Sequence, residues 1–292
     1  VRGIDPQLPA LGLELCLDAV NIANLSIALS QRSIENTLLA MSVGTPFDCY
    51  KGEETPRDVE GKYFPQVFSA VRFCNGLDYL MFETVPSLDA AIGAARAFTA
   101  AHHVFDIAEK TSSFKLTGTI LYLSRLLSAW ERLGEGAVSR FALSYDVGTR
   151  TFTEISPKKE YVISFCLERD GTLNGKKLND AITTLYRTVD HEQLIGPVGI
   201  GINCNSPAVT ERALKSLSPE NKKRVIGIHP NASSERDPRK YERMTRKQAI
   251  SPEAFAHRVA QMVRTFDIHV YGGCCGTDQH TMTKLYHALN PQ

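Results

Sequence analysis

The sequence predicts an α/β fold, in which parallel strands alternate with helices that cover them. Short apolar runs recur along the chain, and each is apolar nearly throughout rather than alternating with polar residues. They span residues 37–43, 79–82, 161–167, 198–203, 224–229 and 268–271. Such runs are typical of strands buried on both faces of a parallel sheet. Helical stretches lie between them, and this alternation of strand and helix indicates right-handed crossovers.

The helices expected between the strands are recognisable by composition. Residues 11–30 are rich in Ala and Leu and contain no proline, which predicts a helix before the first run. Further helices are predicted over residues 58–73, 87–99, 178–189, 207–216 and 251–265. The last of these has a clear start, because Ser251 suits the N-cap and Pro252 suits the first helical position.

The interval between residues 83 and 161 breaks the rhythm of strand and helix. One crossover unit needs about 30 residues, so we expect an insertion at about residues 100–158. Within it, a helix is predicted over residues 116–133 and a small hairpin over 141–155. A lid, an oligomer contact and a lineage-specific decoration all stay open as its role.

Length and composition restrict the class of protein. The chain has 292 residues, enough for a (β/α)8 barrel, which typically uses about 250. Its formal net charge is +1, which gives no electrostatic reason to expect nucleic acid or an anionic membrane as partner. No apolar run approaches the roughly 20 residues that span a bilayer, and there is no signal-peptide pattern. The seven cysteines do not resemble a secreted disulfide framework, so we expect a reducing, cytoplasmic location.

Several residues that can carry chemistry lie where predicted strands end. Glu83 and Cys204 each close an apolar run, and Cys274 and Cys275 follow the last run within a glycine-rich turn. In an α/β barrel the turns after the strands share one face, and that face carries the chemistry. These four residues are therefore expected to meet although they lie far apart in the sequence.

The paired cysteines predict a metal site. Neighbouring cysteines rarely bond to each other, because consecutive Cα atoms are about 3.8 Å apart and a disulfide needs roughly 4.4–6.8 Å. Two thiolates side by side suit a soft metal, although two small buried residues at a strand end are the alternative. Cys204 supplies a third sulfur at the same rim, and three thiolates favour zinc. Catalytic zinc keeps one position open, and a thiol substrate would fit there.

Several short motifs resemble signature segments of the homocysteine S-methyltransferase family. They are Phe82-Glu83-Thr84, Ser164-Phe165, Asp170-Gly171-Thr172, Gly201-Ile202-Asn203-Cys204, Pro230-Asn231 and Gly272-Gly273-Cys274-Cys275-Gly276-Thr277-Asp278. The resemblance covers residues 36–97 and 161–289. It implies a (β/α)8 TIM barrel that forms one homocysteine-binding domain over residues 1–292, with the insertion between its fourth and fifth strands.

The resemblance also implies an activity and a ligand set. The family transfers a methyl group to the sulfur of homocysteine and so produces methionine. By motif match, Cys204, Cys274 and Cys275 would bind Zn²⁺. The nucleophile would be the zinc-activated thiolate of the substrate, so no protein general acid or base is assigned. A possible homo-oligomer stays open.

Further residues are candidates for binding the substrates. Glu83 matches the acid expected near the ammonium group of homocysteine, with a helix N-cap or an ion-pair partner as the alternative. Asn203 is a candidate substrate ligand, unless it only orients the neighbouring Cys204. Phe47 and Tyr50 follow the run 37–43 and could face a cationic donor through cation–π contact, although ordinary loop packing would explain them equally well.

The expected methyl donor is a small cation. The form Cys275-Gly276-Thr277-Asp278 resembles the sulfonium-using branch of the family, which favours S-methylmethionine or S-adenosylmethionine over betaine. A sulfonium leaves as a neutral molecule and needs no general acid. The alternatives are a betaine-dependent enzyme and a methyltransferase for another thiol or a selenol.

The sequence departs from the family pattern in three places. Two front strands, one ending in Asp-Gly-Gly and one carrying a Thr-Asn-Thr-Tyr-like segment, are not evident. A barrel without them would expose unpaired edges, so we expect a truncated sequence or one that omits a segment near its start. A catalytically inactive barrel with a binding role is the alternative. The family's His after Asp278 is replaced by Thr281, with His280 one position early, and the segment after Asn231 is unusually charged.

The remaining cysteines and two strand histidines are interpreted as parts of the core. Free cysteines pack as small apolar side chains, and a hydrogen-bonded core position is expected for a histidine in an apolar strand. The residues so interpreted are Cys16, Cys49, Cys74, Cys166, His229 and His269.

Overall fold

The computed structural model describes residues 40–46, 55–73, 78–111, 160–233 and 249–291, and the statements below concern these residues. They contain a curled sheet of six parallel strands, in the order β1-β2-β3-β6-β7-β8. The strands are β1 (Ala40–Gly44), β2 (Tyr79–Val85), β3 (Glu160–Phe165), β6 (Gly199–Asn203), β7 (Val225–His229) and β8 (Val270–Tyr271). Each strand coincides with one of the six predicted apolar runs, so the predicted parallel α/β architecture is confirmed.

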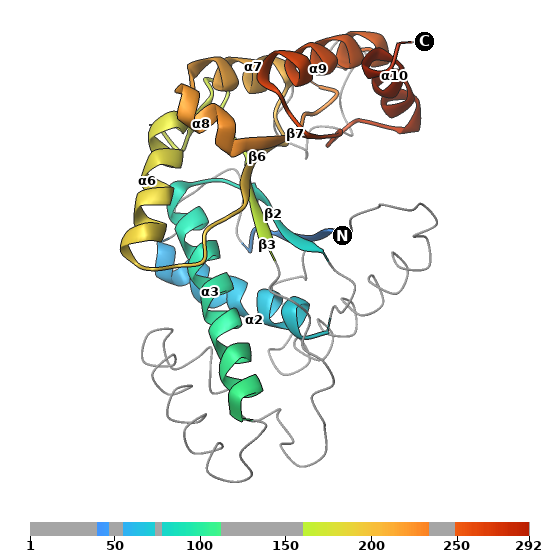
Figure 1. Cartoon of the computed structure of the whole chain (residues 1–292). Helices are drawn as coiled ribbons and strands as arrows, with labels where there is room; N and C mark the ends of the chain where they lie inside the picture. The colour runs from blue at the N-terminus through green and yellow to red at the C-terminus, as the bar shows by residue number, and fades with distance from the viewer. Residues whose placement is uncertain (1–39, 47–54, 74–77, 112–159, 234–248, 292) are drawn as a thin grey trace.

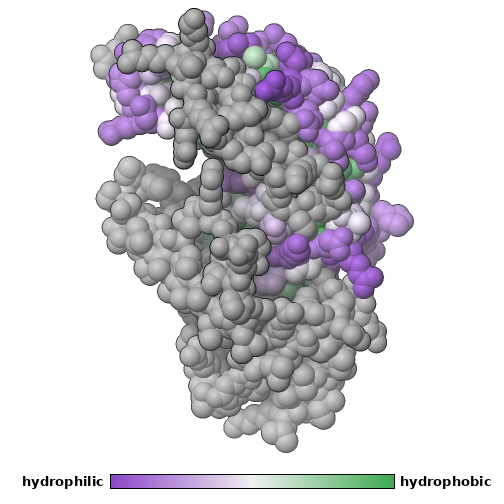
Figure 2. All heavy atoms as spheres, turned by 180° about the vertical axis from the view of Figure 1, so that it is seen from behind, coloured by the Kyte–Doolittle hydropathy of each residue, from purple (hydrophilic) through white to green (hydrophobic). Residues whose placement is uncertain are grey.

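Helices follow the outer side of the curled sheet (Figure 1). They are α2 (Pro56–Phe73), α3 (Leu88–Thr111), α6 (Leu178–His191), α7 (Pro207–Ser216), α8 (Pro219–Arg224), α9 (Pro252–Phe266) and α10 (Gln279–Leu289). The predicted start of α9 is confirmed, because the Ser251 side chain accepts a hydrogen bond from the Ala254 amide at 3.2 Å. On the face seen in Figure 2, the surface of the described residues is mainly hydrophilic. None of the described helices is long and apolar enough to cross a membrane.

The core lies between the sheet and its helices. Apolar side chains pair in register across neighbouring strands, from Val43 through Phe82 and Ile163 to Ile200, and all four are buried. The Phe82 ring packs edge-on against Tyr63 of α2, with ring centroids 5.0 Å apart. Side chains alternate between the two faces of a strand. Every second residue counted from Val43, Phe82, Ile163 or Ile200 along its own strand therefore faces the helices.

Ser164 of β3 and two glycines of β6, Gly199 and Gly201, lie on the other face of the sheet. Ser164 alternates with the core-facing residues of β3 and pairs in register with Gly201 of β6. A Cβ added to Gly201 would lie 2.7 Å from the Ser164 hydroxyl, and one added to Gly199 would lie 2.4 Å from Ile226. These glycines therefore make room for side chains of the neighbouring strands on this inner face.

Several short or extended elements differ from the sequence predictions. Helix α3 runs to Thr111 instead of ending near residue 99, so the first part of the predicted insertion belongs to this helix. The two-residue strands β4 (Thr172–Leu173) and β5 (Lys176–Lys177) form a hairpin that was not predicted, and neither were α8 and α10. The predicted core position of His269 is wrong, because its side chain is 70% exposed beside Asp267.

Some predictions fall on residues outside the described part of the chain. They concern the helix at 11–30, the helix at 116–133, the hairpin at 141–155, the candidate donor ligands Phe47 and Tyr50, and the core positions of Cys16, Cys49 and Cys74. These stay predictions.

Candidate metal centre

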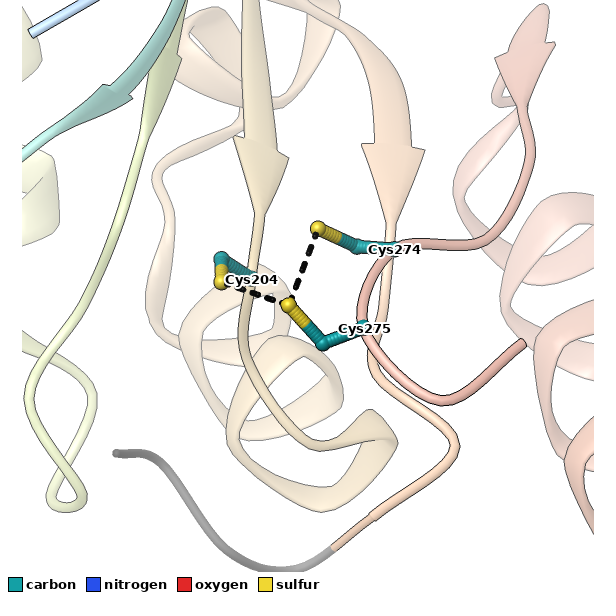
Figure 3. A group of neighbouring side chains, drawn as sticks. All are labelled: Cys204, Cys274 and Cys275. Atoms are coloured by element: carbon teal, nitrogen blue, oxygen red, sulfur yellow. Dashed lines mark hydrogen bonds between the residues drawn. The ribbon is translucent and has the colours of Figure 1, made fainter. Parts of the chain in front are cut away.

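The three predicted cysteines meet at the carboxyl edge of the sheet. Cys204 directly follows β6, and Cys274 and Cys275 lie in the loop after β8. Strand β7 lies between β6 and β8 in the sheet, so the two loops approach each other across its end. In Figure 3 the three side chains point toward one another.

The spacing of the three sulfurs matches a metal site. The Sγ atom of Cys275 lies 3.7 Å from Cys204 Sγ and 3.9 Å from Cys274 Sγ, and all three sulfurs lie within 4.8 Å of one another. Zinc–sulfur bonds of about 2.3 Å in a tetrahedron separate two ligand sulfurs by about 3.8 Å. Among the described residues this is the one group of three or more metal-type ligands.

The backbone around Cys204 holds its thiol at the rim. Cys204 has a left-handed backbone conformation, with φ +58°, which costs a non-glycine residue about 1–2 kcal/mol. Its amide donates to the carbonyl of His229 at 3.1 Å, and the residue is 3% exposed. The turn bends the chain away from β6 directly at the thiol, and strained positions of this kind cluster at functional sites.

The two glycines beside the paired cysteines are required for different reasons, one for space and one for backbone conformation. A Cβ on Gly273 would lie 2.4 Å from the Thr277 hydroxyl oxygen, and that hydroxyl donates to the Cys274 carbonyl at 2.7 Å. Gly276 has φ +78°, a left-handed conformation that favours glycine. The turn is therefore tight at Gly273 and left-handed at Gly276, and it delivers two consecutive thiols to the same place.

The Cys204 and Cys275 thiols raise the energy of the ionised form of Cys274. Hydrogen bonding to Cys204 and Cys275, together with burial, raises the pKa of the Cys274 thiol well above its usual range. Without a cation, the Cys274 thiol therefore resists deprotonation. A divalent cation reverses this preference, because a coordinating thiol loses its proton.

Glu83 lies at the same edge of the sheet, near the end of β2. Its carboxylate accepts a hydrogen bond from the Ser42 hydroxyl of β1, and the residue is half-buried. The negative charge of Glu83 alone would raise the pKa of His229 in β7. Burial has the larger effect and lowers the pKa of His229 below its usual value. The Nδ1 atom of His229 is buried and has no hydrogen-bond partner among the described residues, which contradicts the prediction of a hydrogen-bonded core histidine.

Asn203 is engaged with the backbone of a distant strand. Its side-chain oxygen accepts from the Thr84 amide at 3.1 Å, and the residue is 2% exposed. Thr84 has φ +55°, so the bond stabilises the turn that follows Glu83. Asn203 thus links the end of β6 to the end of β2, a contact that the sequence did not predict.

The departure at Thr281 has a local structural explanation. The Asp278 side chain caps α10 by accepting from the Thr281 amide at 2.8 Å and from its hydroxyl at 2.7 Å. Both bonds lower the pKa of Asp278 below its usual range. Thr281 is buried, so this position fixes the start of the helix that follows the cysteine loop.

Two asparagines complete the described surroundings of the thiols. Asn231, just after β7, accepts from the Cys275 amide at 3.1 Å through its side-chain oxygen. Asn205, next to Cys204, bonds the backbone of Leu167 through both side-chain atoms. Asn231 was predicted only as part of a family motif and no role was predicted for Asn205, although an asparagine near the end of a buried strand suits such backbone contacts.

A curled parallel sheet with a three-thiol cluster at its carboxyl edge defines an α/β-barrel protein whose clustered thiols could hold a soft metal. The model of the homocysteine S-methyltransferase family matches residues 10–289, and the chain belongs to this family. The match begins before residue 36, where the recognisable motifs begin, and it includes the segment interpreted as an insertion.

Solved structures show the same fold. The apo form of the homocysteine methyltransferase MmuM from Escherichia coli matches with a TM-score of 0.50 and 16% identity, over 99% of this chain and 76% of that one. Its oxidized form matches with the same TM-score and identity, over 94% and 71% of the two chains. No curated protein matches the sequence.

Proposed function

We propose that this protein transfers a methyl group from a sulfonium donor, S-methylmethionine or S-adenosylmethionine, to the sulfur of homocysteine. The observation that carries the proposal is the triangle formed by Cys204, Cys274 and Cys275, with sulfur separations of 3.7 and 3.9 Å on two sides. Membership of the homocysteine S-methyltransferase family supports it.

The three cysteines fit a zinc ion. Sulfur ligands favour soft metals over magnesium or calcium, and the two measured separations lie within about 0.1 Å of the edge of a zinc–thiolate tetrahedron. Three protein ligands leave the fourth position for a substrate atom. When bound, zinc would lower the pKa of a thiol in that position, so that the acceptor sulfur is present as a thiolate at neutral pH.

Residues at the same rim would hold the rest of the acceptor. The Glu83 carboxylate is held by the Ser42 hydroxyl and would pair with the ammonium group of homocysteine. The lowered pKa of His229 keeps its imidazole neutral near Glu83, so no second cation competes for that carboxylate. Asn203 would act by fixing the turn after Glu83, because its side-chain oxygen already accepts from Thr84.

The proposed reaction needs no proton from the protein. A lone pair of the acceptor thiolate forms the new bond to the methyl carbon, and the donor sulfur keeps the electrons of the bond that breaks. The donor therefore leaves as a neutral thioether and the product is methionine. We propose that Phe47 and Tyr50 face the donor's positive charge, since aromatic rings attract cations by about 0.5–2 kcal/mol.

The test is methionine formation from homocysteine with S-methylmethionine, S-adenosylmethionine and betaine supplied in turn. We expect turnover with a sulfonium, loss of turnover after removal of zinc by a chelator, and recovery when zinc is restored. Cys274→Ala should be inactive. Cys166→Ala is the matched control, because Cys166 is a buried cysteine that forms no disulfide and lies outside the cluster. Full activity of Cys274→Ala would refute the proposal, and turnover with betaine alone would reassign the donor.

A further inference from the structure

Asn231 is hydrogen-bonded to the segments that carry two of the three thiols. Its backbone amide donates to the carbonyl of Asn205, the residue after Cys204, at 2.8 Å. Its side-chain oxygen accepts from the amide of Cys275 at 3.1 Å. The residue is completely buried. Asn231 therefore joins the loop after β6 to the loop after β8 through both its main chain and its side chain.

Asn205 extends this connection to a further strand. Its side-chain oxygen accepts from the Leu167 amide at 3.0 Å, and its side-chain nitrogen donates to the Leu167 carbonyl at 2.8 Å. Asn205 is 3% exposed. The residue next to Cys204 is thus fixed to the chain that leaves β3, while Cys204 itself is fixed to His229 by its amide. Four neighbouring strand ends are tied together by buried amide groups.

We propose that Asn231 is a positioning residue, which sets the separation of the Cys204 and Cys275 thiols before any metal binds. The inference rests on the proposed metal-binding role of the cysteines. On this proposal, the metal affinity of the cluster depends on a buried amide outside the set of three thiols. Partners outside the ligand set commonly tune metal sites in this way.

The observed geometry supports a site that is formed in advance. The 3.7 Å separation of the two sulfurs is already within about 0.1 Å of the edge that a zinc–thiolate tetrahedron requires. A loop that had to move on binding would lose part of the binding free energy to its own ordering. The Cys275 loop is instead held on both sides, because the Ala232 amide donates to the Cys275 carbonyl at 3.0 Å.

A general structural role is the competing explanation, since any buried asparagine loses stability when its bonds are removed. The chain offers a matched residue for this comparison. Asn221 of α8 is 2% exposed and donates to the Asn179 carbonyl and to the Thr183 hydroxyl, each at 2.9 Å. It precedes β7 and so lies at the opposite, amino edge of the sheet from the thiols.

The experiment compares zinc affinity in the Asn231→Ala and Asn221→Ala variants of the full chain. Affinity is measured by competition with a chromophoric chelator, at a temperature where both metal-free variants are folded by circular dichroism. We expect both to melt earlier than the wild type. Only Asn231→Ala should bind zinc more weakly, by about 10- to 100-fold. Equal affinities of Asn231→Ala and the wild type would overturn the inference.

A measurement on the wild type keeps the inference testable if Asn231→Ala does not fold. In the metal-free protein, the Cys275 amide should exchange slowly with deuterium, because its hydrogen bond to Asn231 already exists. Fast exchange that becomes slow only after zinc is added would contradict a preformed site. A wild type that binds no zinc would instead refute the proposed function, so the two failures are distinguishable.

Discussion

Replacing Cys275 by serine should remove most of the affinity for zinc. Cys275 Sγ makes both short edges of the sulfur triangle, at 3.7 Å to Cys204 and 3.9 Å to Cys274. A serine hydroxyl is nearly isosteric, but it keeps its proton at neutral pH and is a poor ligand for a soft metal. The remaining two thiols would offer the metal only one edge of the tetrahedron.

The size of the loss follows from the number of ligands. Zinc sites with four protein ligands bind with about 10–16 kcal/mol at pH 7, so one ligand accounts for about 3–4 kcal/mol. This corresponds to a fall in affinity of roughly 10²–10³-fold. Because the structure brings three thiols together, removing one of them takes away a third of the protein's ligand set.

The assay is zinc stoichiometry after dialysis, followed by titration against a chromophoric chelator. Cys166→Ser is the control, because Cys166 is a cysteine that directly follows β3 and lies outside the cluster, although it is more deeply buried than Cys275. The control should keep one zinc per chain with wild-type affinity. If Cys275→Ser also kept one zinc with affinity within threefold of the wild type, the three-thiol site would be refuted.

Three further substitutions test the surroundings of the site and the fold. Gly273→Ala should destabilise the fold by about 1–3 kcal/mol and weaken zinc retention, because its Cβ would meet the Thr277 side chain at 2.4–2.6 Å; unchanged zinc retention would contradict this. Arg96→Met should reduce the free energy of unfolding at pH 7 by about 0.2–1 kcal/mol, because it breaks a pair with Glu192 whose side chains are 29% and 30% exposed. Arg96 lowers the pKa of Glu192, so this stability is present above the ordinary glutamate pKa and lost as pH falls through the folded value. Denaturant titrations should therefore show no difference near pH 2, and an undiminished difference there would count against the pair. Ser164→Ala should leave stability unchanged or raise it by up to about 1 kcal/mol, because the buried hydroxyl has no hydrogen-bond partner among the described residues; a clear loss in thermal melts would show that the hydroxyl is satisfied.

The strands could be predicted because each buried strand is a single continuous segment of apolar residues in the sequence. Residues 161–165 of β3 are all buried, so the run is apolar except where Ser164 faces Gly201. The hairpin β4–β5 is too short for any periodicity. Its signal was Asn174-Gly175, with φ +47° and +74°, a pair that is typical of a tight hairpin turn.

The ligands of the candidate site could be predicted, whereas their supports could not. Cysteine is a rare residue with specific chemistry, and Cys274 and Cys275 stand beside glycines that mark a turn. Asparagine is common in turns whether or not it supports a site. The bond between Asn231 and the Cys275 amide depends on which strand ends are neighbours, and sequence order alone does not specify this.

The sulfur separations are also a property of strand register. Asn203 pairs with His229 across β6 and β7, and Ile228 pairs with Tyr271 across β7 and β8. A slip of one residue at either pairing would shift a thiol by about 3.3 Å and turn the inner face of the strand outward. That shift is nearly the whole 3.7 Å between Cys204 and Cys275.

The inner-face packing resists such a slip. Ile226 fills the space over Gly199, and Ser164 fills the space over Gly201. After a slip, Ile226 and Ser164 would each face a residue that has a Cβ atom. A Cβ at the present glycine positions would lie 2.4 Å from Ile226 and 2.7 Å from Ser164, which is too close. The same glycines that let the strands pack closely inside the curled sheet therefore hold the register on which the thiol cluster depends. A substitution at Gly199 should consequently impair zinc binding, although the residue lies at the far end of β6 from Cys204.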